Sequence, residues 1–196
     1  MKNILILITG TVILFYGGIL KAENPHLHSN YAGQENRQIK SLSESDVIQL
    51  KNGQGWGLAK AAELNGMPGP KHILEMKKEI ELTEDQELKI QKLFENMNRD
   101  ARELGNKFIS LEKDLNDSFT SGDINENSLK KKLKNIAVVQ SELRFIHLNA
   151  HIKASKVLTH SQIVRYNQLR GYSNDPCSSI PPGHDPEMWK KHNGCN

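Results

Sequence analysis

Two histidines stand four residues apart in the segment FIHLNAHIK, and their spacing suits metal chemistry. His147 and His151 fall on one side of a helix, because residues i and i+4 are neighbours on a helical surface. Two imidazoles at this spacing suit a shared Zn²⁺, Cu²⁺ or Ni²⁺. Two ligands alone make a weak site, so a third donor is needed, from His72, Glu142 or a second subunit. The alternative is that both histidines are satisfied within the fold or lie at its boundary.

The C-terminal tail carries a second group of metal-binding residue types. Five of its residues would suit Cu(I) or Zn²⁺ together: Cys177, His184, Met188, His192 and Cys195. No C-x-x-C knuckle is present, and a cysteine pair in an exported chain normally oxidises. We therefore expect a disulfide between the two cysteines, which would stabilise the tail by about 3 kcal/mol, and metal-bound thiols are the alternative.

Enzyme signatures are absent from the sequence. It contains no G-x-S-x-G, no H-E-x-x-H and no phosphate-cradling glycine loop. Carboxylates such as Glu84, Asp85, Glu95 and Glu103 are explained by helix starts and solvated helix faces. We expect no enzymatic activity and no required cofactor, with Zn, Cu or Ni as possible ligands.

The first 22 residues, MKNILILITGTVILFYGGILKA, are typical of a secretory signal peptide. A lysine precedes an apolar run, and Ala22 ends it before a polar stretch, so we expect cleavage after Ala22. A retained membrane anchor is the alternative, because the run approaches the ~18 residues that span a bilayer. Losing Lys2 and Lys21 lowers the formal charge from +3 to +1, which leaves no strong basic field for nucleic-acid binding.

A five-residue pattern, Leu-Thr-x-x-Gln, occurs twice and predicts two helix starts. The copies are LTEDQ, with Leu82, Thr83 and Gln86, and LTHSQ, with Leu158, Thr159 and Gln162. In each copy the threonine hydroxyl accepts from the glutamine N–H, while the glutamine side chain reaches back to the threonine N–H. Each copy is therefore a capping box, and no catalysis is needed to explain it.

Between the two motifs, apolar residues alternate four and three apart, which is typical of helices that pack along a narrow seam. The first helix places on its seam Ile90, Phe94, Met97, Ala101, Leu104, Phe108, Leu111 and Leu115. The segment NDSFTSGDINENS predicts a turn. The returning helix, from Asn127 or Ser128, places on its seam Leu129, Leu133, Ile136, Gln140, Leu143, His147, Ala150, Ala154 and Val157. Gln140 and His147 could fix helix register as a polar pair.

These patterns predict an all-α fold, built on a long antiparallel helical hairpin with short flanking helices. The expected organisation is a signal peptide over 1–22, an extended arm over 23–40, a short-helix lead-in over 41–69, the hairpin domain over 70–172 and a cysteine-containing tail over 173–196. The lead-in predicts one helix from Ser43 to about Lys51 and another around Trp56 to Leu64.

The returning helix has a second apolar stripe, formed by Val138, Phe145, Leu148 and Ile152, roughly opposite its seam. A contiguous exposed apolar patch usually marks an interaction site, and Arg144 could steer acidic partners. We expect the stripe to meet a second subunit or a client. Cover by the segment from Trp56 to Leu64 is the alternative.

Two LTxxQ motifs that flank a helical hairpin behind a signal peptide resemble the Spy and CpxP-like family of exported proteins. The likeness extends over about Pro70 to Tyr172. It implies a cradle-shaped periplasmic homodimer, without ATP, that shields unfolding or stress-damaged envelope proteins. Relatives in the same superfamily bind or sense heavy metals, so a periplasmic Zn, Cu or Ni protein is the alternative, and a partner of a membrane sensor protein is a third. The Gly-rich lead-in and the cysteine-containing tail depart from the compact chaperones.

Overall fold

The computed structural model describes residues 29–172, 180, 182–193 and 195. The predicted signal peptide and the start of the arm lie outside these residues. Every regular element in the described chain is helical, which confirms the all-α fold. The described residues divide into two units, one that ends at Glu35 and one that begins at Asn36. None of the described helices has an apolar stretch long enough to cross a bilayer.

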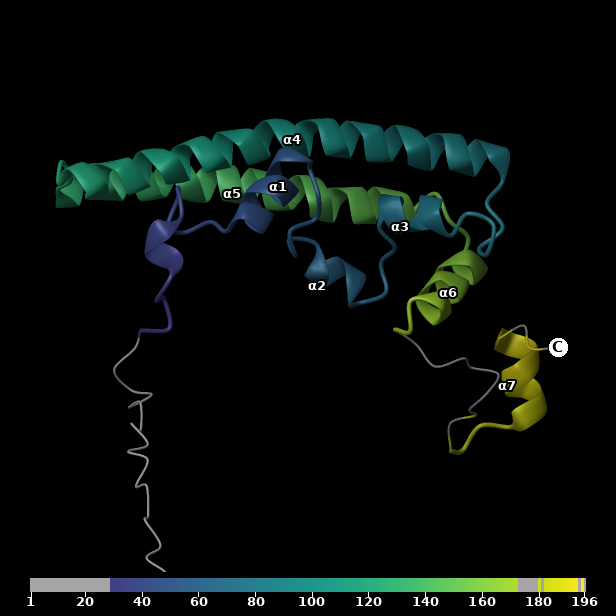
Figure 1. The fold of residues 1–196 in the computed structure, drawn as a ribbon. Helices are drawn as coiled ribbons and strands as arrows, with labels where there is room; N and C mark the ends of the chain where they lie inside the picture. The colour runs from purple at the N-terminus through teal and green to yellow at the C-terminus, as the bar shows by residue number, and fades with distance from the viewer. Residues whose placement is uncertain (1–28, 173–179, 181, 194, 196) are drawn as a thin grey trace, which may run out of the picture. The chain divides into compact units, whose positions relative to one another are not determined.

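The hairpin is formed by α4 (Glu84–Ser121) and α5 (Glu126–Ser155), which run side by side in opposite directions (Figure 1). Gly122 joins them with a positive φ of 72°, and Asn125 starts α5 with its own capping box. The helix α4 extends past the point where we predicted the turn, through the residues NDSFTS. Ser118 and Thr120 donate their hydroxyls to carbonyl oxygens four residues back, and so remain compatible with the helix.

The other described helices are short: the 3₁₀ helix η1 (Gln34–Asn36), α1 (Glu44–Lys51), α2 (Lys60–Glu63), α3 (Pro70–Glu75), α6 (His160–Leu169) and α7 (Pro186–Asn193). Of these, α1, α2 and α3 contact the hairpin. The helix α2 is shorter than the one predicted around Trp56 to Leu64, because Trp56 and Gly57 both have positive φ angles. The arm that we expected to reach residue 40 ends earlier, because Ile39 is buried in the core.

The core consists of two apolar clusters along the hairpin. The first joins Ile39, Leu42 and Leu50 to α4 and α5 around Ala101, Phe108, Ile136, Val139 and Leu143. The second joins Ile73, Ile80, Ile90, Ala154, Leu158 and Tyr166. Gly105 lets α1 approach α4 closely, since a Cβ there would lie 2.4 Å from the Leu50 carbonyl oxygen.

The seam of α5 differs from the predicted one at two positions, Gln140 and Leu133, whose side chains are both exposed. Val139 is buried and Gln140 is exposed, so the polar pair predicted between Gln140 and His147 is wrong. The buried positions advance from Ile136 to Val139 and then to Leu143. A three-residue step here follows the 3.6-residue period of a straight helix, which drifts away from a strict heptad.

Candidate functional site

Both LTxxQ motifs form the capping boxes that the sequence predicts. Thr83 accepts from the Gln86 N–H, and Thr159 accepts from the Gln162 N–H. In return, the glutamine side chains accept from the backbone N–H of Thr83 at 3.1 Å and of Thr159 at 2.9 Å. The leucines differ in burial: Leu158 is buried in the second cluster, and Leu82 packs against it while half-buried.

The two motifs also bind each other, which the sequence did not predict. Gln86 Nε2 donates to Gln162 Oε1, and Gln162 Nε2 donates to Gln86 Oε1, both at 2.9 Å. Each amide also donates to a backbone carbonyl, Gln86 to Val157 at 2.9 Å and Gln162 to Glu81 at 3.1 Å. The motifs therefore tie the start of α4 to the start of α6, which is a structural role.

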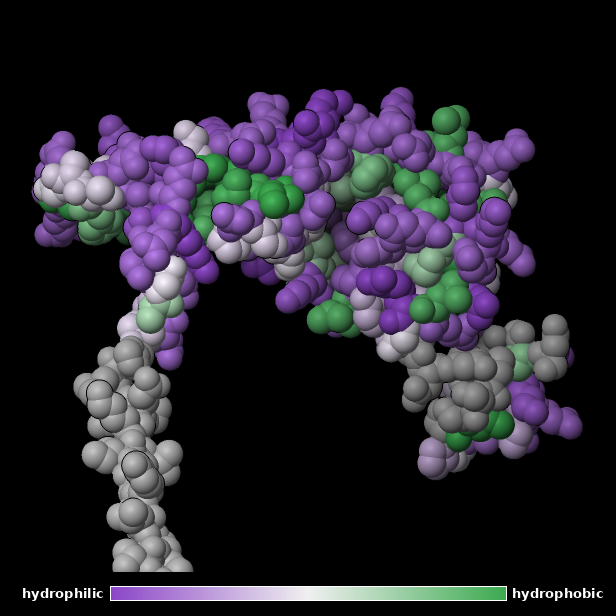
Figure 2. All heavy atoms as spheres, in the orientation of Figure 1, coloured by the Kyte–Doolittle hydropathy of each residue, from purple (hydrophilic) through white to green (hydrophobic). Residues whose placement is uncertain are grey.

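The apolar stripe on the outer side of α5 is exposed. Phe145 is 64 % exposed, Val138 49 % and Ile152 44 %, while Leu148 is half-buried. The segment from Trp56 to Leu64 does not cover these three side chains, because each remains at least 44 % exposed. Figure 2 shows apolar atoms emerging among polar ones on the face that it presents, at the level of α1 and α5.

Leu133 belongs with these exposed residues, although the sequence pattern placed it on the seam. Its side chain is 48 % exposed. The same drift that buries Val139 instead of Gln140 turns Leu133 away from α4. A helical period of 3.6 instead of 3.5 residues would have found it.

Positive charge accompanies this stripe. Five cationic side chains of α5 and its C-cap are exposed and form no ion pair in the described chain: Lys131, Lys134, Arg144, Lys153 and Lys156. The acidic residues of α5 are Glu126, which pairs with Lys130, and Glu142. The outer side of α5 therefore combines apolar side chains with a net positive charge.

His147 and His151 lie on the opposite side of α5, and both are buried, with 3 % and 7 % of their surface exposed. His151 Nδ1 donates to the Met67 carbonyl oxygen at 2.8 Å, because a carbonyl oxygen only accepts. The far edge of the same ring faces Gly69, where a Cβ would lie 2.8 Å from Nε2. His151 is thus held by the lead-in backbone.

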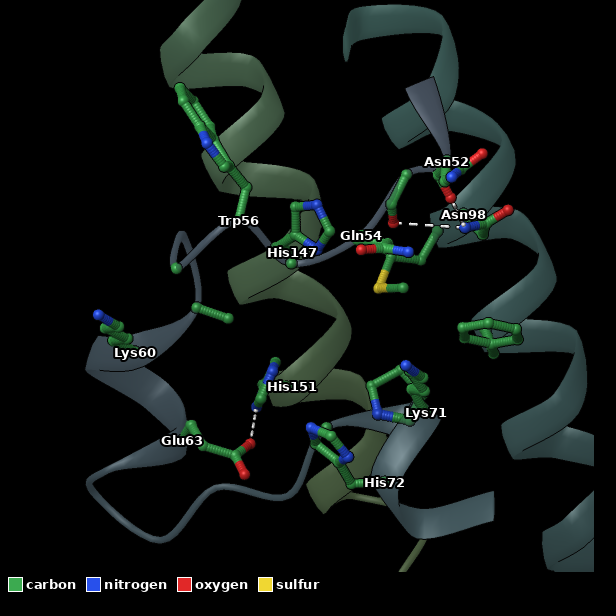
Figure 3. Close-up of a pocket in the computed structure, with 18 of the residues that line it drawn as sticks. Asn52, Gln54, Trp56, Lys60, Glu63, Lys71, His72, Asn98, His147 and His151 are labelled. Atoms are coloured by element: carbon green, nitrogen blue, oxygen red, sulfur yellow. Dashed lines mark hydrogen bonds and ion pairs between the residues drawn. The ribbon is translucent and has the colours of Figure 1, made fainter. Parts of the chain in front are cut away.

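His147 differs from His151, because its Nε2 is buried and has no hydrogen-bond partner within the part of the chain that the structure describes. Burial lowers the pKa of His147 to about 4, and the neighbouring His151 contributes less to the shift. The ring lines a pocket of about 390 Å³, whose walls include His72, Phe94 and Met97. Figure 3 shows the His147 ring between Trp56 and Gln54, with His72 on the far side of the pocket.

Glu63 organises the lower side of this pocket, a role that the sequence analysis missed. Its Oε1 accepts from the Tyr166 hydroxyl at 2.8 Å, from Arg170 Nε at 3.1 Å and from the Tyr172 hydroxyl at 3.1 Å. Its Oε2 lies 3.8 Å from His151 Nδ1. Burial and the bond to Glu63 raise the pKa of Tyr166 well above its usual value. This network fastens α6 to the lead-in.

The structure places only one of the two proposed third metal donors, His72 and Glu142, near His147. His72 lines the pocket, but Glu142 does not. No group of three or more His, Cys, Asp or Glu residues that could hold a metal ion occurs within the described residues. His72 Nδ1 bonds Glu75 Oε2 at 2.8 Å, so the ring nitrogen left to bind a metal is Nε2.

The tail residues that were named as metal ligands, in the alternative to a disulfide, also have local contacts. The His184 ring meets the Trp189 ring edge-on at 4.7 Å. Asp185 caps α7 by accepting from the Met188 N–H at 2.9 Å, and the Met188 and His192 side chains are exposed. Cys195 is disulfide-bonded, and Cys177, its expected partner, lies outside the described residues.

By its fold, the chain is an all-helical protein built on an antiparallel hairpin. Comparisons with protein-family models, with curated proteins and with solved structures found no match. The surface of α5 and the pocket at His147 therefore carry the functional argument.

Proposed function

We propose that this protein is a periplasmic, ATP-independent chaperone or envelope-stress protein, like the Spy and CpxP-like proteins that its two LTxxQ motifs and helical hairpin resemble. The exposed apolar stripe of α5 carries the proposal, because Phe145 alone leaves 64 % of its surface in water. Unfolding clients expose apolar segments, and these would be shielded while they cover the stripe. Release needs no nucleotide, because the contact is shallow and bordered by polar side chains.

The stripe is large enough for weak and reversible binding. Fully burying one large apolar side chain is worth about 1.5–3 kcal/mol, so the half-exposed residues of the stripe contribute about 1–2 kcal/mol each. Four such side chains contribute about 4–8 kcal/mol before the cost of association, which corresponds to an affinity of about millimolar or weaker for the stripe alone. A second copy of the chain covering part of the surface is compatible with the homodimer that the resemblance implies.

Suppression of aggregation tests the proposal directly. A chemically denatured client is diluted into buffer with equimolar protein, and light scattering is followed. We expect the wild type to suppress scattering and the double variant Phe145→Ser with Ile152→Ser to lose about tenfold or more in potency. Leu88→Ser is the matched control, since Leu88 is 71 % exposed on α4. Equal suppression by all three proteins, or none by the wild type, would refute the proposal.

A second candidate function is heavy-metal binding or sensing, which the pocket at His147 supports. Among the described residues, the buried His147 Nε2 has no hydrogen-bond partner, and His72 and Met97 line the same pocket. The bond from His72 to Glu75 resembles the carboxylate–histidine pairs that orient metal ligands and leave the second nitrogen free. Binding of Zn²⁺, Cu²⁺ or Ni²⁺ would then draw His72 towards His147.

Titration calorimetry with the three metals tests this candidate. His72→Ala is the informative variant, because the His72 side chain is 33 % exposed and lies outside both core clusters, so we expect the variant to fold. We expect a site of micromolar or tighter affinity that weakens at least tenfold in His72→Ala. His160→Ala removes an exposed histidine elsewhere and should bind as the wild type does. Only millimolar affinity, or an unchanged affinity in His72→Ala, would exclude this site.

A further inference from the structure

A second groove, of about 550 Å³, lies between the loop at Trp56 and the outer part of α5. One wall is the loop Trp56–Gly57–Leu58, and the other is formed by Ala137, Gln140, Ser141 and Arg144. Trp56 has a positive φ of 42°, which is uncommon for a bulky residue. Its Nε1 donates to Asp46 Oδ1 at 2.8 Å and its ring packs on Phe108, so this wall is fixed in place.

The wall formed by α5 offers hydrogen-bond donors for an anion. Arg144 is exposed and forms no ion pair in the described chain. Its planar guanidinium matches the geometry of a carboxylate and binds it through two parallel hydrogen bonds. Gln140 and Ser141 supply an amide and a hydroxyl beside it, and no carboxylate lines the groove. The groove is therefore suited to a carboxylate.

The groove adjoins the apolar stripe. Ala137 precedes Val138, and Arg144 precedes Phe145. In each pair the first residue lines the groove and the second belongs to the stripe. A ligand whose carboxylate lies in the groove would place its adjacent side chains against Val138 and Phe145. Lys131 and Lys134 extend the positive charge along the same side of α5.

We propose that Arg144 and this groove select client segments in which Asp or Glu adjoins large apolar residues. The inference rests on the proposed chaperone function and names its preferred substrate. An anionic lipid surface has a related charge, but a bilayer contacts a flat face, whereas Arg144 borders a recess behind a fixed loop. A peptide bound along the stripe needs to insert only one side chain into such a recess.

Fluorescence anisotropy with three labelled peptides tests the selection. The peptides share the same Leu and Phe residues and have amidated C-termini, and they differ in carrying two Glu, two Gln or two Lys residues. At low salt, we expect the Glu peptide to bind about threefold to tenfold more tightly than the Gln peptide. The difference should shrink at high salt, because exposed charges are screened.

Variants assign this preference to Arg144. Arg144→Gln should abolish the difference between the Glu and Gln peptides, because it removes the guanidinium that binds the carboxylate. Arg144→Lys should retain part of the preference. Arg165→Gln is the matched control, since it removes one exposed positive charge from α6, and it should keep the full preference.

The outcomes separate this inference from the function on which it rests. Equal binding of the Glu and Gln peptides by the wild type, or an undiminished preference in Arg144→Gln, overturns the inference and leaves client binding intact. Binding of none of the peptides overturns both. Co-sedimentation with phosphatidylglycerol vesicles, combined with equal peptide affinities, would assign the surface to membranes and also overturn the inference.

Discussion

The buried His147 should make the protein sensitive to acid in a predictable pH range. Its folded pKa is about 4, compared with 6.5 for an exposed histidine. The unfolded chain therefore binds this proton first, and the folded state loses stability as the pH falls from about 6.5 to about 4. Below that range the contribution no longer changes.

The magnitude follows from the size of the shift. One pKa unit corresponds to about 1.4 kcal/mol, so a shift from 6.5 to about 4 corresponds to roughly 3 kcal/mol of stability lost by acidification. His147→Leu removes the titrating group and fills the site with an apolar side chain. It also removes a buried Nε2 that has no hydrogen-bond partner among the described residues, so we expect this variant to be at least about 3 kcal/mol more stable than the wild type at pH 4.

Urea unfolding at a series of pH values between 7 and 4 measures the effect. Carboxylates also protonate in this range, so the informative quantity is the difference between the wild type and His147→Leu. We expect the wild type to lose roughly 3 kcal/mol more than the variant. His160→Gln removes an exposed histidine and should follow the wild type. Parallel curves for the wild type and His147→Leu would refute the assignment of acid sensitivity to His147.

Two further predictions concern the hairpin itself. Gln86→Leu leaves Gln162 without its amide partner and should lower the free energy of unfolding in urea by about 2–3 kcal/mol. A double-mutant cycle with Gln162→Leu should show a coupling energy of about 1 kcal/mol or more. Additive effects of the two substitutions would contradict the reciprocal bond. Gly105→Ala should lower the free energy of unfolding by at least about 2 kcal/mol, because the new Cβ meets the Leu50 carbonyl oxygen. Gly122→Ala, at an open turn with φ 72°, should lower it by only about 1–2 kcal/mol. Equal losses for the two variants in the same assay would contradict the close approach of α1 to α4.

The sequence predicts those features of the fold that depend on local chemistry. A capping box needs only a threonine and a glutamine three residues apart, so both motifs could be assigned as helix starts. The apolar spacing predicts the hairpin, because alternating steps of three and four residues place one stripe along each helix. The end of α4 was missed, since Ser118 and Thr120 favour turns by propensity but bond their own helix here.

Interactions between residues far apart in the sequence could not be predicted from local patterns. The bond between Gln86 and Gln162 joins residues 76 positions apart, and nothing in either motif names the other as its partner. Glu63 appears in the sequence as one acidic residue of a short helix. Its role depends on α6 returning to place Tyr166 and Arg170 beside it, which only the folded chain shows.

Two departures from ordinary packing lie on opposite sides of α5. On the inner side, His147 is buried with an unpartnered nitrogen, and on the outer side Phe145 is largely in water. Natural proteins keep such departures mainly where function requires them. The positions point away from each other, and a helix held by α4 transmits little between its faces, so the two features should be separable. His147→Leu should therefore raise the stability in acid without changing the suppression of client aggregation. Phe145→Ser with Ile152→Ser should weaken this suppression without changing the stability in acid. A loss of client suppression in a stably folded His147→Leu variant would show instead that the pocket and the stripe form one functional unit.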